Sequence, residues 1–297
     1  MRPFILLVLV LNVLFVSCNE DTCSKEDSEN SDCDSGAIDY SLNGLDQEDP
    51  ILIQAIKDRF LVPPDPKKKL KLQQKPKGAI LYGQYGQPAE VDKIFKRRKL
   101  NGFFIEAGAF DGEVYSNSLL FELKRNWTGL LVEPNPDFFA KMKAKNRNAH
   151  LLPNCFSTKT TPEVVDFDAS ALIGGIIQEG RIMPGDIGRS PEYVERPYHR
   201  RTIKAQCFPL YSVLLALGNP KVDYFSLDIE GAEIPVLKTI PWDKVDITVV
   251  EVEMNHLGKV FDGSEDVLKR FMKKNGYKFR GMVEIDGIFV KKGFKAT

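Results

Sequence analysis

The chain has no excess of charge of either sign, because its 41 Lys and Arg residues balance its 41 Asp and Glu residues. The composition therefore gives no reason to expect a nucleic-acid partner. The chain also lacks an apolar run of the roughly 20 residues that a membrane-spanning helix needs. Hydrophobic residues still make up 43% of its 297 residues, which is enough to bury one α/β core with appendages.

The longest apolar run is N-terminal, where Arg2 precedes residues 4–16. This arrangement is typical of a secretory signal. We expect residues 1–18 to be a signal peptide or an uncleaved signal-anchor that associates with a membrane; a faint resemblance to a bacterial lipoprotein cleavage site is a third alternative. The signal peptide and the signal-anchor both predict that the protein is located in the lumen of the endoplasmic reticulum or Golgi, or is secreted. A sequon makes Asn126 a predicted glycosylation site and agrees with entry into this pathway.

Cysteines are few: the chain has five, and cleavage of the signal would leave an even set. In an oxidising compartment such a set favours disulfides, although the pairing cannot be deduced from sequence alone. We expect bonds between Cys23 and Cys33 and between Cys155 and Cys207. The alternative is that all of these thiols are free.

Composition divides the mature chain into three parts. Residues 19–50 are rich in Asp, Glu, Ser and Asn and predict a disordered acidic stem. Residues 51–82 predict a helix followed by an arm rich in Pro and Lys, whose basic run could contact an anionic membrane surface or the stem. Residues 83–297 are the predicted domain. Within it, hydrophobic periodicity fails from 157 to 205, which favours a long loop that is a lid or is disordered.

The central motif of the domain is FFIEAGAFDG at 103–112, an apolar strand followed by Glu106, Gly108 and Gly112. A strand that turns through glycines into a helix presents backbone amides and a helix N-terminus, where α/β folds bind adenosine-type cofactors. One helix length later, a second strand ends at Glu133, the position at which a carboxylate binds the ribose hydroxyls.

Strands and helices alternate through residues 103–152, and strands are again expected at 222–227 and 247–252. This alternation requires a parallel sheet with right-handed crossovers and helices on both faces. Two further strands at 277–282 and 285–291 predict an antiparallel hairpin that closes the sheet. The predicted fold class is therefore α/β, with a mostly parallel, Rossmann-like sheet.

Two more polar groups follow buried strands, Asp228 after the fourth strand and His256 after the fifth. Open α/β sheets bind ligands at such ends. Either side chain could act as a general base that accepts a hydroxyl proton. The alternative for Asp228 is structural, namely that it caps the backbone amides near Gly231. We assign no metal ligands from the sequence.

Four segments, EAGAFDGEVYSNS, GLLVEPNP, VDYFSLDIEGAE and VVEVEMNH, occur in this order. Together they resemble the FkbM-type S-adenosylmethionine-dependent methyltransferases, and specifically the animal branch that includes the Star proteins. The likeness covers roughly residues 83–292 and implies a class I methyltransferase sheet of seven strands. The sequence departs from the broader GxGxG pattern at Ala109 and Phe110, as FkbM-type members do.

The residues and the resemblance together give six candidate cofactor-binding positions: Glu106, Gly108, Gly112, Glu133, Asn154 and Asp228. The resemblance implies that Glu106 and Gly108 hold the methionine end of S-adenosylmethionine and that Glu133 binds its ribose. Asn154, in the turn after the third strand, would lie near the adenine. Asp228 would face both the sulfonium and the methyl acceptor.

Two functions remain open. The first is O-methylation of a sugar or another hydroxylated small molecule. The second is that of a Star-like secretory-pathway protein, which uses the fold to bind membrane-tethered cargo and assists vesicle-mediated export of growth-factor precursors without catalysis. A luminal location favours the second because the methyl donor is made in the cytosol, whereas the intact acidic residues of the pocket favour the first.

Overall fold

The computed structural model describes residues 38–73, 83–169, 173–186 and 201–296. Chain contacts divide the protein into Met1–Asp34 and Ser35–Thr297, and all of the described residues belong to the second unit. The predicted signal at 1–18, most of the predicted stem and the predicted Cys23–Cys33 bond lie outside the described residues.

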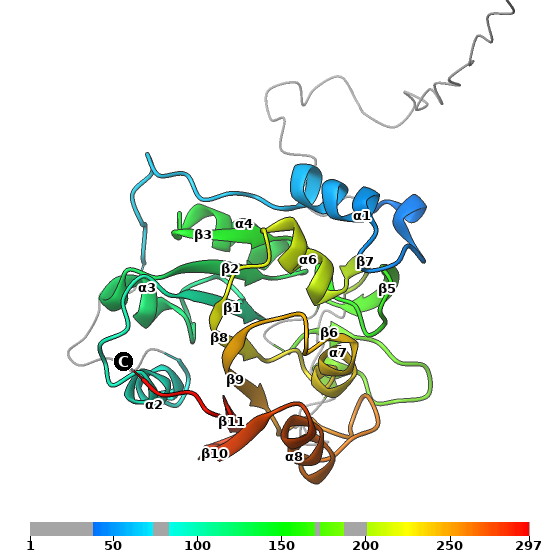
Figure 1. Ribbon diagram of the computed structural model, residues 1–297. Coiled ribbons are helices and arrows are strands. Elements are labelled where there is room, and N and C mark those ends of the chain that lie inside the picture. Colours follow the sequence, from blue (N-terminus) through cyan, green and yellow to red (C-terminus); the bar gives the residue numbers. More distant parts are fainter. Residues whose placement is uncertain (1–37, 74–82, 170–172, 187–200, 297) are drawn as a thin grey trace, which may run out of the picture. The chain divides into compact units, whose positions relative to one another are not determined.

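The main sheet has seven strands in the order β10-β11-β9-β8-β1-β2-β3 (Figure 1). The strands are β1 (Phe103–Ala107), β2 (Thr128–Val132), β3 (Ala149–Leu152), β8 (Val222–Leu227), β9 (Ile247–Glu253), β10 (Tyr277–Val283) and β11 (Asp286–Lys291). All pairs from β3 to β9 are parallel, whereas β11 runs antiparallel to both β9 and β10. The predicted sheet, mostly parallel and closed by an antiparallel hairpin, is confirmed.

Each face of this sheet has its own hydrophobic core, because successive strand residues point to opposite faces. In β1, Ile105 packs in the first core and Phe104 in the second. In β2, Leu130 belongs to the first core and Leu131 to the second. Central parallel strands covered on both faces carry apolar residues in succession, which is why they were readable in the sequence as continuous apolar runs.

Helices cover both faces of the sheet (Figure 1). Those that contribute to the first core are α1 (Pro50–Ala55), the π-helical η2 (Ile56–Phe60), α6 (Leu210–Ala216), α7 (Glu233–Thr239) and α8 (Glu265–Lys274). Those that contribute to the second core are α2 (Gln87–Ile94), α3 (Leu119–Arg125) and α4 (Pro136–Ala144). Asn135 caps α4 by accepting the Asp137 N–H at 3.0 Å.

A second sheet, in the order β4-β7-β5-β6, occupies part of the region that was predicted to be a loop. Its strands are β4 (Cys155–Phe156), β5 (Glu163–Asp168), β6 (Gly175–Ile176) and β7 (Thr202–Phe208), and a 3-10 turn, η3 (Pro184–Asp186), follows β6. The loop prediction for 157–205 is therefore wrong at β5, β6 and the start of β7. These strands are short, and β5 is only half-buried over most of its length, so they give little periodic signal.

Cys155 and Cys207, the second of the two pairs expected to be bonded, are joined by a disulfide in this small sheet. They are register partners in the parallel pair of β4 and β7, and their Cα atoms lie 4.3 Å apart. Both belong to a third hydrophobic cluster, together with Phe167 and Ile176. The bond therefore fixes the small sheet beside the end of β3.

Residues 38–49 were predicted to be the end of a disordered stem, and this is wrong. Leu42 is buried in the first core, and the Gly44 N–H donates to the Pro162 carbonyl at 3.3 Å. Asp39 caps a 3-10 turn, η1 (Tyr40–Leu42), by accepting the Ser41 N–H at 2.9 Å. A single buried leucine and acid-capped turns order a segment whose composition alone predicts disorder.

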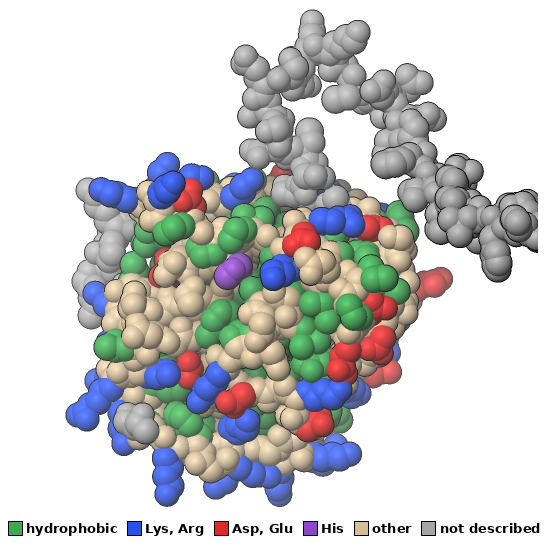
Figure 2. Space-filling model, turned by 45° about the horizontal axis from the view of Figure 1, so that its top comes forward, with side chains coloured by type: hydrophobic (Ala, Val, Ile, Leu, Met, Phe, Trp, Pro, Cys, Tyr) green, Lys and Arg blue, Asp and Glu red, His purple; other side chains and the backbone are tan. Residues whose placement is uncertain are grey.

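Charges of both signs occur over the surface. Figure 2 shows one face, on which Lys and Arg side chains lie mainly near the margins, with acidic side chains among them and apolar side chains exposed between them. Within the described ranges, every helix is too short or too polar to cross a bilayer.

Candidate active site

The order of the strands reverses between β1 and β8, which are neighbours in the middle of the main sheet. The helix after β1, α3, packs on one face of the sheet, and the helix after β8, α7, packs on the other. Connections that leave in opposite directions open a crevice at the carboxyl ends of the strands. Here the crevice consists of two adjoining lobes that share the lining residues Ala107, Gly108, Phe110, Asp228 and Glu230.

Gly108 allows the ends of β1 and β8 to lie against each other. Its φ is +82°, and a Cβ atom at this position would lie 1.9 Å from the carbonyl oxygen of Asp228. The Asp228 N–H donates to the Ala107 carbonyl at 3.1 Å, which fixes the two strand ends in register. Only glycine fits here, because any side chain would collide with backbone rather than with a movable side chain.

The first lobe is mainly apolar and has a volume of about 700 Å³, including the solvent at its mouth. Its apolar walls come from the β1 turn, α4 and both sheets: Phe110, Val132, Phe138, Phe156, Phe167, Ile176 and Ile229. Phe110 and Phe138 meet edge to face, with ring centroids 4.2 Å apart. Aromatic walls with a few fixed polar groups suit a flat nucleobase and its sugar.

Glu133 is the buried carboxyl of this apolar lobe. One of its oxygens accepts the Phe110 N–H at 2.9 Å, and the other accepts the Asn135 N–H, also at 2.9 Å. Burial raises the pKa of Glu133 to about 7, although these two backbone N–H groups act in the opposite direction. Each oxygen has a second lone pair, so the carboxylate can still accept hydrogen bonds from a diol.

The second lobe has more polar lining residues than the first, and four of them are acidic. Its polar lining comes from the segment before α2 and from β1, β8, β9 and the turns that follow these strands: Gln84, Tyr85, Glu106, Tyr115, Asn117, Ser226, Asp228, Glu230, Glu253, Asn255 and His256. Tyr115 lies in the turn before α3 with φ +58° and is 56% exposed. The lobe thus combines hydrogen-bonding groups with carboxyls beside the shared wall.

Glu106 lines this second lobe, but its carboxylate is engaged by the turn that follows β1. Its oxygens accept the backbone N–H groups of Asn117 at 2.7 Å and Ser118 at 3.2 Å, and the Ser116 hydroxyl at 2.9 Å. The Asn117 side chain in turn donates to Ser226 on β8 at 3.0 Å. Glu106 therefore shapes the turn around the predicted methionine subsite.

Asp228 lies on the wall between the two lobes. Its Oδ1 atom is buried and has no hydrogen-bond partner among the described residues. Burial, and then the nearby Glu253 and Glu230 carboxyls, raise the pKa of Asp228 well above its usual value. The alternative role in capping belongs instead to Glu233, whose Oε1 accepts the N–H groups of Ile229 and Gly231 at 3.0 Å each. Asp228 is thus left available to a ligand.

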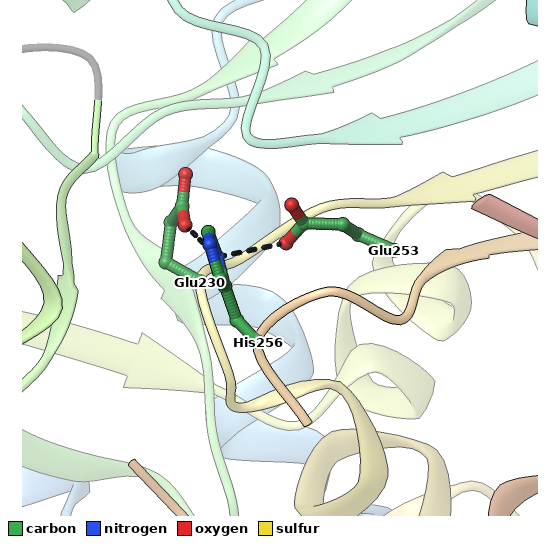
Figure 3. A group of neighbouring side chains, drawn as sticks. All are labelled: Glu230, Glu253 and His256. Atoms are coloured by element: carbon green, nitrogen blue, oxygen red, sulfur yellow. Dashed lines mark ion pairs between the residues drawn. The ribbon is translucent and has the colours of Figure 1, made fainter. Parts of the chain in front are cut away.

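His256 lies between two carboxylates, as Figure 3 shows. Its Nδ1 is 3.2 Å from an oxygen of Glu253 and forms a second ion pair with Glu230. Burial lowers the pKa of His256, but the two acidic partners outweigh burial and raise it to about 10. The ring therefore carries a proton in this state, which makes it less suited than Asp228 to act as a base. Its Nε2 lies 3.2 Å from the side-chain nitrogen of Asn255.

Three other candidate residues lie at the border of the cleft or away from it. Asn154 lines neither lobe, because its side-chain amide donates to the Gln206 carbonyl at 3.2 Å; its neighbour Cys155 lines the apolar lobe. Gly112, with φ +74°, brings the turn after β1 close to Met142 of α4. Asn126 is exposed in the loop between α3 and β2 and donates to Asn101 at 2.7 Å.

Sequence reasoning missed several residues of the site. Phe138 of α4 was not among the candidates, and the contribution of Phe167 and Ile176 depends on the small sheet that was not predicted. Glu230 was quoted within a motif but given no role. Its φ of +60° is unusual for a residue other than glycine, and Phe110 at +50° shares this feature. Such backbone strain concentrates at functional sites, but φ cannot be deduced from the sequence.

The residues present fit S-adenosylmethionine. In the apolar lobe, the Glu133 carboxylate and the aromatic walls would hold the adenosine. The close approach at Gly108 leaves backbone, rather than a side chain, at the junction of the lobes. The unpartnered Oδ1 of Asp228 lies on the same wall, where a positively charged sulfonium would offset the surplus of carboxyls.

Solved structures of methyltransferases resemble the chain only weakly. The methyltransferase FkbM from Methylobacillus flagellatus has 10% identity and a TM-score of 0.38, over 64% of this chain and 43% of that one. A precorrin-6y C5,15-methyltransferase from Geobacter metallireducens has 12% identity and a TM-score of 0.35, over 75% of this chain and 98% of that one. A TehB-like methyltransferase from Corynebacterium glutamicum has 11% identity and a TM-score of 0.35, over 70% of this chain and 89% of that one.

This chain therefore spans less than half the length of the Methylobacillus protein. No curated protein sequence matches it. The Methyltransferase FkbM domain, in contrast, matches residues 106–279, which is more than half of the chain. That span contains the ends of β1, β2, β8 and β9, and thus every polar residue that lines the cleft except Gln84 and Tyr85. On this match, the chain belongs to the FkbM methyltransferase domain family.

Proposed function

We propose that this protein is an S-adenosylmethionine-dependent methyltransferase that methylates a hydroxyl group on a sugar or another small molecule. The supporting observation is the two-lobed cleft at the strand ends, with Asp228 on the shared wall. One lobe has the aromatic walls and buried carboxyl expected of an adenosine site, and the other has many polar lining residues and suits a hydroxylated acceptor.

Methyl transfer to a hydroxyl requires in-line alignment and a group that accepts the hydroxyl proton. When bound, S-adenosylmethionine would supply an electrophilic methyl group on a cationic sulfur. Asp228 is our candidate for the base, since this residue lines both lobes and its buried Oδ1 has no hydrogen-bond partner among the described residues. Its pKa is raised in the free protein by burial and by the carboxyls around it. A positive charge placed nearby would favour its ionised form.

We further propose that the protein works in the secretory pathway, either released into the lumen or held at a membrane by its N-terminal segment. The Cys155–Cys207 disulfide supports this proposal, because such bonds persist in oxidising compartments. Asn126, the acceptor residue of the sequon, is exposed, which agrees with it.

The same disulfide favours a second candidate function. A methyl donor made in the cytosol must be imported before a luminal enzyme can use it. A Star-like protein would instead use the fold to bind membrane-tethered cargo, such as a growth-factor precursor, during vesicle-mediated transport and without catalysis. This alternative does not require the apolar lobe to bind a nucleoside.

Calorimetric titration of the purified protein with S-adenosylhomocysteine, the demethylated product, tests the proposed function. We expect one site per chain with micromolar affinity, about −8 kcal/mol. Adenosine should compete for the site, because the apolar lobe carries the nucleoside contacts. No heat at about 1 mM ligand, an affinity weaker than about −4 kcal/mol, would reject the enzyme and leave the cargo-binding alternative.

A further inference from the structure

Three side chains from two strand ends converge in the wall of the polar lobe. Glu230 lies in the turn after β8, Glu253 is the last residue of β9, and His256 follows in the next turn (Figure 3). Each offers one ligand atom, and these atoms all lie within 4.8 Å of one another. Glu253 and His256 are 3% and 6% exposed, so the group is almost closed to solvent.

The atoms that face one another in this group lack well-directed hydrogen bonds. Glu230 Oε2, Glu253 Oε2 and His256 Nδ1 are all buried without a hydrogen-bond partner among the described residues, although they are close enough to form ion pairs. A buried polar atom without a hydrogen bond is unfavourable and needs another partner. One imidazole proton can point at only one oxygen at a time, so it leaves at least one carboxylate unsatisfied.

A second, overlapping group also contains buried carboxylate oxygens without hydrogen-bond partners. Asp228, Glu233 and Glu253 also bring ligand atoms within 4.8 Å of one another. Glu233 is fully buried, at 0% exposed, and its Oε2 has neither a hydrogen bond nor an ion pair in the described part of the chain. No Lys or Arg of the described residues forms an ion pair with Glu230, Glu233 or Glu253. The cluster therefore has more acidic groups than one histidine can neutralise.

We propose that Glu230, Glu253 and His256 bind a divalent metal ion in the wall of the polar lobe. Ligand atoms less than 4.8 Å apart fit an ion that lies about 2.0–2.5 Å from each of them. Two carboxylates and one imidazole form a mixed oxygen and nitrogen donor set, which suits Mn²⁺ or Zn²⁺ better than Ca²⁺. On binding, the ion takes the place of the ring proton on Nδ1, which leaves to solvent.

Neighbouring residues are arranged to support such an ion. Glu233 holds the turn that carries Glu230, because its Oε1 accepts the N–H groups of Ile229 and Gly231. Asn255 lies 3.2 Å from the outer ring nitrogen of His256, and with its amide turned over it would accept the Nε2–H that a metal-bound ring presents. Such contacts orient metal-ligating histidines in proteins.

The position of the ion suggests its role, and this part of the inference rests on the proposed function. All three ligands line the polar lobe, which Asp228 also lines. A divalent ion there would hold an acceptor hydroxyl beside Asp228 and lower the pKa of that hydroxyl. This predicts an acceptor with two neighbouring oxygen atoms, which could bind the ion together.

Binding of Mn²⁺ to the full-length protein, followed by electron paramagnetic resonance, tests the site without any activity assay. We expect one Mn²⁺ per chain, with a nitrogen coupling in the pulsed spectrum that comes from His256. His256→Gln should abolish this coupling and weaken binding by about 100-fold, and the nearly isosteric Glu253→Gln should weaken binding by at least about tenfold. His150→Gln is the matched control, because this histidine on β3 lines neither lobe. It should leave the nitrogen coupling and the Mn²⁺ affinity unchanged.

Two results would overturn this site. One is the absence of bound Mn²⁺ or Zn²⁺ at about 1 mM, which is near the weakest affinity of protein sites for divalent cations. The other is binding that persists equally in both variants, with thermal melts showing that these are folded. Mn²⁺ binding without S-adenosylhomocysteine binding would retain the metal site and reject the proposed function, and the converse would reject only the metal site.

Discussion

Gly108→Ala should abolish binding of S-adenosylhomocysteine and destabilise the domain. The added methyl group would lie 1.9 Å from the Asp228 carbonyl oxygen, so the ends of β1 and β8 would have to separate. Overpacking against backbone and an alanine at φ +82° together should lower the free energy of unfolding by about 3 kcal/mol or more. Urea unfolding and calorimetry measure the two effects.

Gly218→Ala is the matched control for this variant. Gly218 has nearly the same backbone angle, φ +83°, but no atom lies within 4 Å of the position that its Cβ would take. It should therefore show only the conformational effect, about 1 kcal/mol, with ligand affinity unchanged. If Gly108→Ala binds the ligand as well as Gly218→Ala does, the close approach of the strand ends is not required for the cofactor site.

Glu133→Ala should weaken S-adenosylhomocysteine binding by about 100-fold or more, because each hydrogen bond from the ribose to a charged carboxylate contributes about 1.5–3 kcal/mol. In the wild-type protein, affinity should also depend on pH. The pKa of the free carboxyl is about 7, and the ribose hydroxyls bind its ionised form better. Affinity should therefore fall by as much as tenfold per pH unit below about 7 and level off above it.

Glu133→Gln separates the charge of this group from its structural role. Glu133 accepts hydrogen bonds from the backbone N–H groups of Phe110 and Asn135. The side-chain oxygen of a glutamine can still accept one of these two. This variant should remain folded in thermal melts, bind weakly and lose the part of the pH dependence that belongs to residue 133. A wild-type affinity that stays constant between pH 5 and pH 8 would show that ionised Glu133 does not bind the ligand.

The main sheet could be predicted from the sequence because its strands are buried on both faces. β8 begins and ends at the predicted residues, Val222 and Leu227, and the polar group after each central strand was recognised. Alternating strands and helices leave few possible topologies, so the convergence of Glu133 and Asp228 on one cleft could also be anticipated.

The small sheet and the polar lobe were harder to predict because their interactions connect distant parts of the chain. β5 and β7 pair across a long insertion, and only tertiary contacts stabilise them. Glu253 and His256 were visible as polar residues at the end of β9 and beyond it, but the contact of His256 with Glu230 depends on the turn after β8. Sequence also does not show that Glu106 is occupied by the following turn, whereas Asp228 is left without a partner.

A crystal structure of the protein with S-adenosylhomocysteine is the most direct test of the central claim, that the cleft at the ends of β1, β2 and β8 binds the cofactor. We expect the adenosine between Phe110, Phe138 and Ile176, with the ribose hydroxyls on the Glu133 carboxylate and the sulfur beside Asp228. A ligand bound elsewhere, or a cleft still filled only with water at saturating ligand, would contradict it.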